Sequence, residues 1–414
     1  MKETKFKDTE IGRIPEEWET LYIHQITEIS TGATPSTNIN EYWENGTIRW
    51  MSSGELNNKI IYDVNGRITQ KGYDNTGTHM LPKNCVLIGL AGQGKTRGTA
   101  AYNKVELCTN QSIAAILPNS KYESKYLYFY IDSLYDKLRL LSAGDGGRGG
   151  LNKQILQNLE IAMPPLNEQH HIASALTSID NLISSLGKLI EKKKNIKQGA
   201  MQQLLTGKTR LKGFNEPWME HTIDELFDLG NGYTPSKSNP AYWTNGTIPW
   251  FRMEDIRTNG RILKDSIQHV TPEAVKGNGL YPKYSIILST TATIGEHALL
   301  IADSLANQRF TFLNRKVNRR DMIDIIFFYH YCFILGKWCR DNINAGGLLA
   351  VNMDDLKNHS IYIPKSIAEQ QAIATILTKM DDEITALEAK RAKYEAIKQG
   401  MMQQLLTGKI RLIG

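Results

Sequence analysis

The sequence predicts an α+β protein that is built twice: two globular α/β heads in tandem, each followed by one long helix. Three observations predict this fold class. Segments recur along the 414 residues at a spacing of about 200. Short β-rich runs and Asn-Gly turns mark the first part of each copy. A helical period without proline fills the second part, and the length exceeds what one compact core supports.

The internal repeat is the strongest feature of the chain. TGATPS at 31–36 returns as NGYTPS at 231–236, and YWENGTIRW at 42–50 returns as YWTNGTIPW at 242–250. Residues 196–211 and 397–412 are identical at 14 of 16 positions. The second half is therefore a copy of the first, and both copies are predicted to share one fold.

Each copy divides into a head and a helix. The heads are predicted at 1–163 and 211–363, with strands at Val86–Leu90 and Ile286–Ser289. Pro164-Pro165 and Pro364 end the heads, because proline suits the first turn of a helix and is absent from the stretches that follow. The spacer helices are predicted within 164–210 and 364–414.

The two helices carry matching apolar seams. Apolar residues follow one another at alternating spacings of four and three: Ile172, Leu176, Ile179, Ile183, Leu186 and Ile190, then Ile373, Leu377, Met380, Ile384 and Leu387. Each helix is predicted to run about 40 residues, from near Asn167 to Thr206 and from Ala368 to Thr407, or roughly 60 Å. Two like seams in one chain associate most readily about a two-fold axis. We therefore expect an intramolecular antiparallel coiled coil with inverted heads, which is the symmetry of a DNA duplex.

Composition bounds the class of protein. The 49 basic and 43 acidic residues leave a formal charge of +6, a mild excess that permits a nucleic-acid partner. Four scattered cysteines and nine dispersed histidines predict neither a disulfide framework nor a metal centre. The polar N-terminus lacks a signal-peptide core, and the most apolar stretch, 323–335, is too short to span a bilayer. We expect a cytoplasmic protein with no membrane partner.

The order head, helix, head, helix, the TGxTPS and YWxNGxIxW segments, and the PxxEQxxIAxxL opening of the first helix at 165–176 resemble the specificity (S) subunits of type I restriction-modification enzymes. The resemblance covers essentially the full chain. It implies that the heads are target-recognition domains, each reading one half of a bipartite double-stranded DNA site, and that the helices bind two methyltransferase (M) subunits. It implies a chain with no catalytic centre and no cofactor: S-adenosylmethionine, ATP and magnesium are expected on the M and the restriction/translocase (R) subunits.

The sequence gives less support to an enzymatic function. Residues 89–96, GLAGQGKT, match the phosphate-loop pattern GxxxxGK[ST]. That loop needs a helix starting at its lysine, whereas here Arg97 leads into a short stretch with no amphipathic period, and the second copy lacks the lysine. A methyltransferase would need a glycine-rich cofactor loop and a [DN]PP[YF] segment, which are absent. The remaining alternative is a non-catalytic scaffold whose two heads bind proteins.

Residues shared by the copies are predicted to build a common frame. The matched aromatics, among them Trp50 and Trp250, are expected in the core, and Asn152 and Asn352 are expected to cap helices. Two shared sets leave a functional reading open. Gln111 and Gln308 fit either a structural hydrogen bond or contact with adenine. Turn residues fit either a simple turn or contact with phosphate: Thr34, Ser36, Thr234 and Ser236.

Polar residues that differ inside matched loops are the better candidates for base readout, because they change specificity without changing the frame. Four groups fit this description: Ser52 and Ser53 against Arg252; Gln93, Lys95 and Arg97 in a glycine-rich loop; Thr291, Thr293 and His297 in its second copy; and Arg148 in the run 144–150. Arg252 has the donors to pair with guanine. The alternative for each is a solvated loop side chain.

Overall fold

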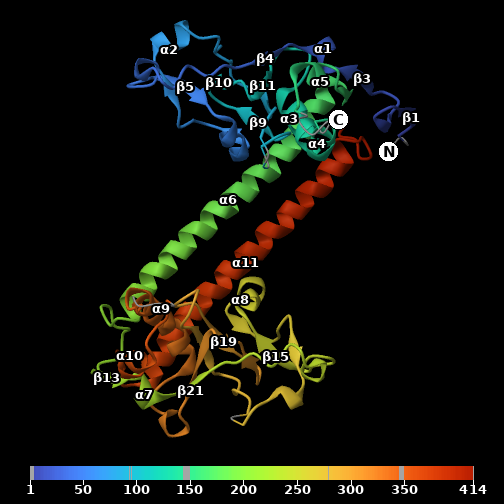
Figure 1. Ribbon diagram of the computed structural model, residues 1–414. Helices are drawn as coiled ribbons and strands as arrows, with labels where there is room; N and C mark the ends of the chain where they lie inside the picture. The colour runs from blue at the N-terminus through green and yellow to red at the C-terminus, as the bar shows by residue number, and fades with distance from the viewer. Residues whose placement is uncertain are drawn as a thin grey trace. The chain divides into compact units, whose positions relative to one another are not determined.

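The computed structural model describes residues 4–92, 94, 96–142, 150–277, 279–344 and 349–413 (Figure 1). The chain forms two compact units, one made of 1–187 with 389–414 and the other of 188–388. The first unit therefore holds the first head, the beginning of the first long helix and the end of the second. The second unit holds the complementary pieces around the second head.

The first head is built on a five-stranded sheet of order β4-β11-β8-β9-β6. Its strands are β4 (Ile29–Thr31), β6 (Ile60–Ile61), β8 (Val86–Gly89), β9 (Ala100–Asn103) and β11 (Ile113–Ile116). Smaller sheets are formed by β1 (Phe6–Thr9) with β2 (Gly12–Pro15), β3 (Glu19–Tyr22) with β12 (Glu160–Met163), and β5 (Ile48–Met51) with β7 (Arg67–Ile68) and β10 (Cys108–Thr109). The helices are α1 (Ile23–Ile26), α2 (Gln70–Asp74), α3 (Ser124–Ser133), α4 (Tyr135–Leu141) and α5 (Lys153–Gln157), with 3-10 turns η1 (Asn40–Tyr42) and η2 (Ser53–Asn58).

The second head repeats this topology with a sheet of order β14-β21-β18-β19-β16. Its strands are β14 (Phe227–Asn231), β16 (Ile262–Leu263), β18 (Ile286–Ser289), β19 (His297–Leu300) and β21 (Phe310–Arg315). The smaller sheets are β13 (Trp218–Thr222) with β22 (Ser360–Pro364), and β15 (Ile248–Phe251) with β17 (His269–Val270) and β20 (Leu305–Ala306). The helices are α7 (Ile223–Leu226), α8 (Met253–Asn259), α9 (Ile325–Asp341) and α10 (Met353–Asn358), with η3 (Pro240–Tyr242), η4 (Pro272–Ala274) and η5 (Val317–Arg319).

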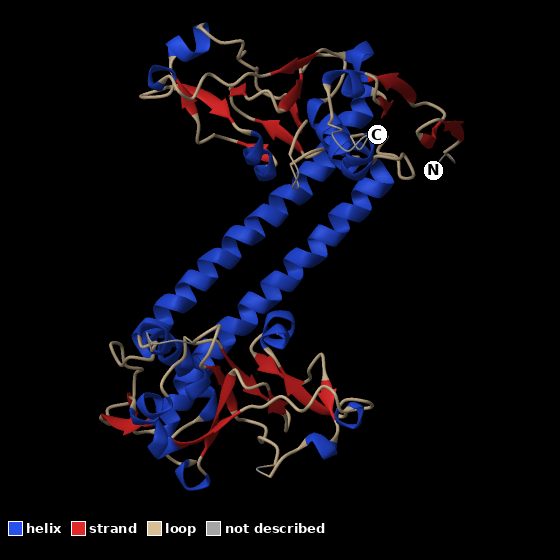
Figure 2. Cartoon of the chain, in the orientation of Figure 1, coloured by secondary structure: helices blue, strands red, loops and turns tan. Residues whose placement is uncertain are grey.

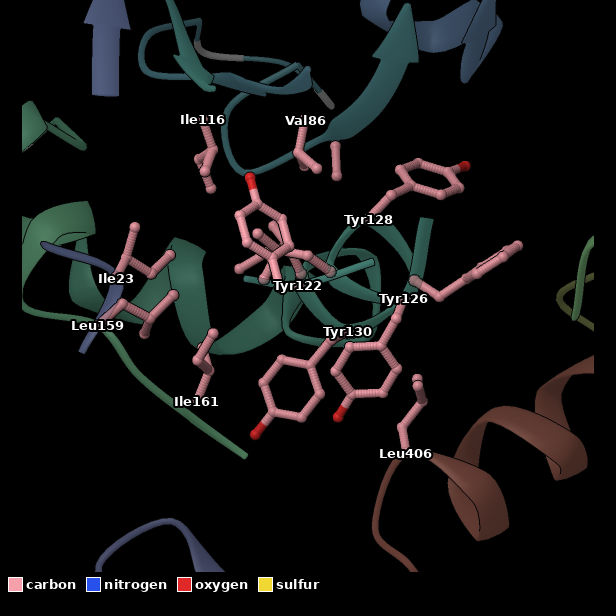
Figure 3. Close-up of a cluster of buried hydrophobic side chains, with 14 of the residues drawn as sticks. Ile23, Val86, Ile116, Tyr122, Tyr126, Tyr128, Tyr130, Leu159, Ile161 and Leu406 are labelled. Atoms are coloured by element: carbon pink, nitrogen blue, oxygen red, sulfur yellow. The ribbon is translucent and has the colours of Figure 1, made fainter. Parts of the chain in front are cut away.

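The central strands of both sheets form where the sequence is continuously apolar. All four residues of β8 and of β18 are buried, as a strand covered on both faces requires. In the first head, α3 packs on β8 and β9 and supplies a row of tyrosines to the core (Figure 3). Leu406, from the far end of the chain, packs in the same core. The predicted strands are confirmed, and the first ends at Gly89 rather than Leu90.

The two long helices are α6 (Leu166–Leu204) and α11 (Ile367–Leu405), visible as the two longest elements in Figure 2. Each is predicted two residues too long at its C-terminus. Gly207 and Gly408 follow the helices with φ of +69° and +68°, the left-handed conformation that ends a helix at low cost for glycine. The sequence placed the start of each helix within one residue.

Within each unit the pieces of α6 and α11 pack antiparallel, as the seams predict. In the first unit, Lys398 on α11 forms an ion pair with Asp180 on α6 at 2.6 Å. In the second unit, Lys197 on α6 forms the matching pair with Asp381 on α11 at 2.5 Å. Lys193 and Lys194, part of the lysine run 192–194, also pair with carboxylates of α11. These charges order the helix pair within each unit.

The segment after each long helix closes a head. In the first unit Arg411 Nε donates to Glu168 Oε1 at 2.7 Å, and Trp18 Nε1 donates to the same carboxylate at 3.0 Å. In the second unit Arg210 Nε donates to Glu369 Oε1 at 2.6 Å. Both glutamates are almost fully buried, at 1% and 0% exposed. A buried carboxylate needs such partners, so these pairs fix where each tail lies.

Among the described residues, no helix is both long and apolar enough to cross a bilayer. α9, which contains most of the apolar stretch 323–335, packs inside the second head instead. The two predicted Asn-Gly turns are confirmed, since Asn45 and Asn245 adopt φ of +59° and +57°.

Candidate nucleic-acid interface

The TP-S turns and the shared glutamines form one structure in each head. Thr34 Oγ1 donates to Gln111 Oε1 at 2.5 Å, and Thr234 Oγ1 donates to Gln308 Oε1 at the same distance. Both glutamines are exposed. Because the threonine occupies the amide oxygen, the amide nitrogen of each glutamine is left as an exposed donor held in a fixed direction. The two residue sets, proposed separately from sequence, therefore belong to a single polar site that each head repeats.

Tryptophans hold this turn in place. Trp43 Nε1 donates to the carbonyl oxygen of Ser36, and Trp50 Nε1 donates to that of Ala33, each at 3.0 Å. The rings of Trp43 and Trp50 meet edge to face with centroids 5.0 Å apart. In the second head, Trp243 and Trp250 repeat this geometry, including the 88° angle between the rings. The aromatics thus act as frame, as predicted, and position Thr34 and Thr234, although Trp43, Trp50 and Trp243 are half-buried rather than core residues.

Ser36 and Ser236 lie in exposed turns beside that frame. Both offer their carbonyl oxygens to a tryptophan, and the Ser236 hydroxyl lies 2.8 Å from that of Ser238. Their hydroxyl groups are therefore placed on the surface next to the Thr–Gln pairs, where a phosphate contact stays a prediction.

The loops after Trp50 and Trp250 differ as predicted. Ser52 is the N-cap of η2, and its amide nitrogen donates to Glu55 at 3.0 Å, while Ser53 is half-buried in the same turn. Arg252 is the N-cap of α8, lies over the Trp250 ring and pairs with Glu254 at 3.0 Å. Its Nε is buried without a hydrogen-bond partner in the described structure. Arg252 therefore already interacts with Glu254 and Trp250 of its own head. To contact a base, its guanidinium has to leave the ion pair with Glu254.

The structure changes which residues correspond to each other in the two glycine-rich loops. Gly98 and Gly295 occupy the same place, because each loop amide returns to the end of its strand, at Gly89 and Ser289. The second loop is therefore three residues shorter, and His297 corresponds to Ala100 on the following strand rather than to Arg97. His297 is 1% exposed on β19, so it is a core residue and not a candidate for base contact.

The other members of these loops are placed as follows. Thr293 Oγ1 lies 3.3 Å from Ser289 Oγ, and Thr291 forms an isolated bridge with Ala350; both threonines are half-buried. Arg97 donates to Ser142 at 3.4 Å, and its Nε is buried without a partner in the described structure. Gln93, Lys95 and Arg148 lie outside the described residues.

The structure around residues 89–96 does not support a phosphate-binding loop. After Thr96 the described chain makes a turn and enters strand β9 at Ala100, so no helix follows the motif as nucleotide binding requires. The four cysteines are buried and free, and burial raises the pKa of Cys85 and of Cys339 to about 12. Within the described residues, no group of three or more His, Cys, Asp or Glu side chains is placed to hold a metal ion.

Sequence reasoning missed a group of cations on the second head. Lys337 and Arg340 lie on the exposed side of α9, and Lys208 follows α6 in the same unit. Lys337 and Arg340 sit three residues apart on one helix, and Asp136 stands where Lys337 has its counterpart in the first copy. Comparing charges between the two copies would have found this difference.

The fold and the paired polar sites define a class: a tandem-repeat protein with two like heads, each followed by one long helix. The family model described as the type I restriction modification DNA specificity domain matches residues 15–198 and again 215–399. The chain therefore belongs to the family of type I restriction-modification specificity subunits.

Individual relatives and a solved structure support this family assignment. The chain is 48% identical to the EcoprrI specificity subunit of Escherichia coli over 173 residues, which cover 40% of this chain and 43% of that subunit. It is 25% identical to the MjaIX specificity subunit of Methanocaldococcus jannaschii over 99% of this chain and 97% of that one. A solved S subunit from M. genitalium has the same fold, with a TM-score of 0.61 at 16% identity over 94% of this chain and 96% of that one.

Proposed function

We propose that this chain is the DNA-reading subunit of a type I restriction-modification complex, and that each head recognises one half of a bipartite duplex site. One observation carries the proposal. The two heads share a frame down to the Thr34–Gln111 and Thr234–Gln308 hydrogen bonds, yet the polar loops attached to that frame differ. A common frame with divergent loops is what two readers of different sequences require.

Docking of M subunits is the second part of the proposal. Leu182, Leu189 and Ile196 follow one another at heptad spacing on α6 and remain 38%, 38% and 47% exposed. Since α6 already buries another seam in the antiparallel pair, this second apolar stripe is available for a partner helix. The helices then also serve as the ruler that sets the number of unread base pairs between half-sites.

A binding titration tests the reading function. The chain alone is expected to bind duplex DNA weakly, because a charge of +6 spread over 414 residues supports few phosphate contacts. Affinity is expected to rise sharply when M subunits are added. A complex that assembles but does not distinguish its site from random duplex would instead support the scaffold alternative.

The ruler is tested by insertion. An insertion at Leu205-Thr206, where the first long helix has ended, would disturb the second head, because Leu205 is fully buried in its core. A seven-residue insertion into each helix, near Gly187 and near Ala389, preserves the seams and lengthens each helix by about 10 Å. At these residues each helix passes from one unit into the other. The unread spacer should lengthen by about three base pairs. An unchanged spacer would show that the helices do not set it.

A further inference from the structure

A cavity of about 800 Å³ lies in the second unit, between the last turns of α6 and helix α9 of the head. Its lining is strongly basic. It contains six cations and, as its one carboxylate, Asp381: the cations are Lys194, Lys197, Lys208, Arg261, Lys337 and Arg340. A concave surface lined by one sign of charge concentrates ions of the opposite sign.

Half of these cations are already neutralised. Lys197 pairs with Asp381 at 2.5 Å, Arg261 with Glu296 at 2.6 Å, and Lys194 with Glu388 at 2.6 Å. The other three, Lys208, Lys337 and Arg340, are exposed and form no ion pair with any described residue. Three uncompensated like charges around one cavity repel each other, so an anionic ligand that binds all three is favoured.

The first unit does not repeat this charge. The helices align with an offset of 201, so Glu395 stands for Lys194 and Asp136 for Lys337, while Lys409 matches Lys208. Asp132 stands where the second head has Phe333, and it pairs with Lys59 at 2.6 Å. The other cations are matched, by Arg139 for Arg340, Lys59 for Arg261 and Lys398 for Lys197, and Asp180 stands for Asp381. The matched positions of the first copy thus carry four cations and four carboxylates and are close to neutral, so the excess of positive charge belongs to the second copy.

The cavity lies next to the loop 290–296, which carries the candidate DNA-contacting residues Thr291 and Thr293. A Cβ at Gly295 would lie 2.2 Å from the carbonyl oxygen of Gly336 and 2.5 Å from Arg340 Nη1, so the loop 290–296 is pressed against α9. At the other side of the loop, Glu296 is held by Arg261. DNA that meets Thr291 or Thr293 on this loop thus passes close to the cations of the cavity.

Resting on the proposed function, we propose that this cavity binds backbone phosphates of the DNA beside the second half-site, and that the first half-site has no equivalent contact. Lys197 and Arg261 both lie over the Phe333 ring, at 5.2 Å from its centroid, which orients these two cations toward the cavity. Lys208 and Lys337 are free to contact phosphate from the rim. The second half then supplies more of the affinity that is independent of sequence.

The test uses the assembled complex of the full chain with its M subunits. The double variant Lys208→Ala with Lys337→Ala removes two exposed, unpaired charges without disturbing the core. If both contact phosphate, the slope of log affinity against log salt should become shallower by about 1.8, and binding at 0.15 M salt should weaken roughly 10- to 30-fold. Specific and random duplexes should be affected alike, because phosphates carry no sequence information.

The first copy offers a matched control, Lys409→Ala with Asp136→Ala, which alters the equivalent positions with no change in net charge. This control should leave both slope and affinity unchanged. An unchanged slope in the Lys208/Lys337 variant, or an equal effect in the control, would overturn the proposal. Loss of M-subunit assembly with intact DNA contact would assign the cavity to a protein partner and overturn it too. A wild-type complex that fails to bind DNA at all would instead contradict the proposed function.

Discussion

The two heads differ least where they build the frame and most in the polar loops and the surface beside them. The edge-to-face tryptophan pairs have the same 5.0 Å separation, and the Thr–Gln hydrogen bonds the same 2.5 Å length. By contrast, the glycine-rich loop is three residues shorter in the second head, and the positions that line the cavity there carry an excess of positive charge that their counterparts in the first copy lack. One frame therefore carries two different surfaces, which is what the proposed reading of two different sequences requires.

The buried histidines provide the largest expected difference between the halves. His297 and His330 are buried in the second head, whereas the first head has Ala100 and Phe129 at these places. Burial, with Arg261 near His297 and Lys197 near His330, lowers the pKa of each to about 3. Both stay neutral when folded, but in the unfolded chain they bind protons below about pH 6.5. Stability present above pH 6.5 is therefore lost as the pH falls toward 3.

We predict that the second head loses about 2 kcal/mol per histidine between pH 6.5 and 4.5, relative to the first. Hydrogen exchange followed by mass spectrometry, corrected for the intrinsic rate at each pH, resolves the two heads separately. His330→Phe, which installs the residue of the first head, should remove about half of the difference. Equal acid sensitivity of both heads would contradict the assignment.

The tail contacts provide the second comparison. Glu168 keeps two donors, Trp18 Nε1 and the Leu412 amide, when Arg411 is removed. Glu369 depends on Arg210, since Trp218 Nε1 has no partner in the described structure. Arg210→Ala should therefore destabilise the second unit by about 3 kcal/mol, and Arg411→Ala the first unit by less. Urea unfolding of both variants measures the order, and the reverse order would refute the role of Trp18.

The shared polar sites provide the smallest expected effect. Gln308→Ala should weaken recognition at the second half-site by about 1–2 kcal/mol, and Gln111→Ala should do the same at the first. Competition binding with duplexes mutated in one half-site at a time separates the two. Should either substitution weaken both half-sites equally, the glutamines would be structural and not readers.

The internal repeat determines how much of the fold and of the candidate site could be predicted from the sequence. The duplicated segments, helix starts and asparagine caps follow from local sequence, and Asn152 and Asn352 indeed accept backbone amides at 2.8 Å. The place of His297 could not be predicted, because a three-residue deletion inside a loop shifts the alignment without a local signal. The link between Thr34 and Gln111 joins residues 77 positions apart, and only the fold brings them together.

The cavity was missed for a similar reason. Its cations come from α6 and the turn that follows it, from α9, and from Arg261 just before β16, so no single stretch of sequence is strongly basic. The packing of Leu406 in the first head is equally remote in sequence. Such contacts depend on which segments the antiparallel helices bring into one unit.

Exchange of one head tests the central claim most directly. Residues 1–163 would be replaced by the corresponding head of another specificity subunit, keeping the equivalents of Trp18 and the Glu168–Arg411 contact so that the chimera closes on its own tail. Mapping methylated adenines in cells that carry the chimera and the M subunits reads out both half-sites at once. The account predicts that one half-site changes while the other half-site stays as it was. A change in both half-sites, or in neither, would contradict the claim that each head reads its own half.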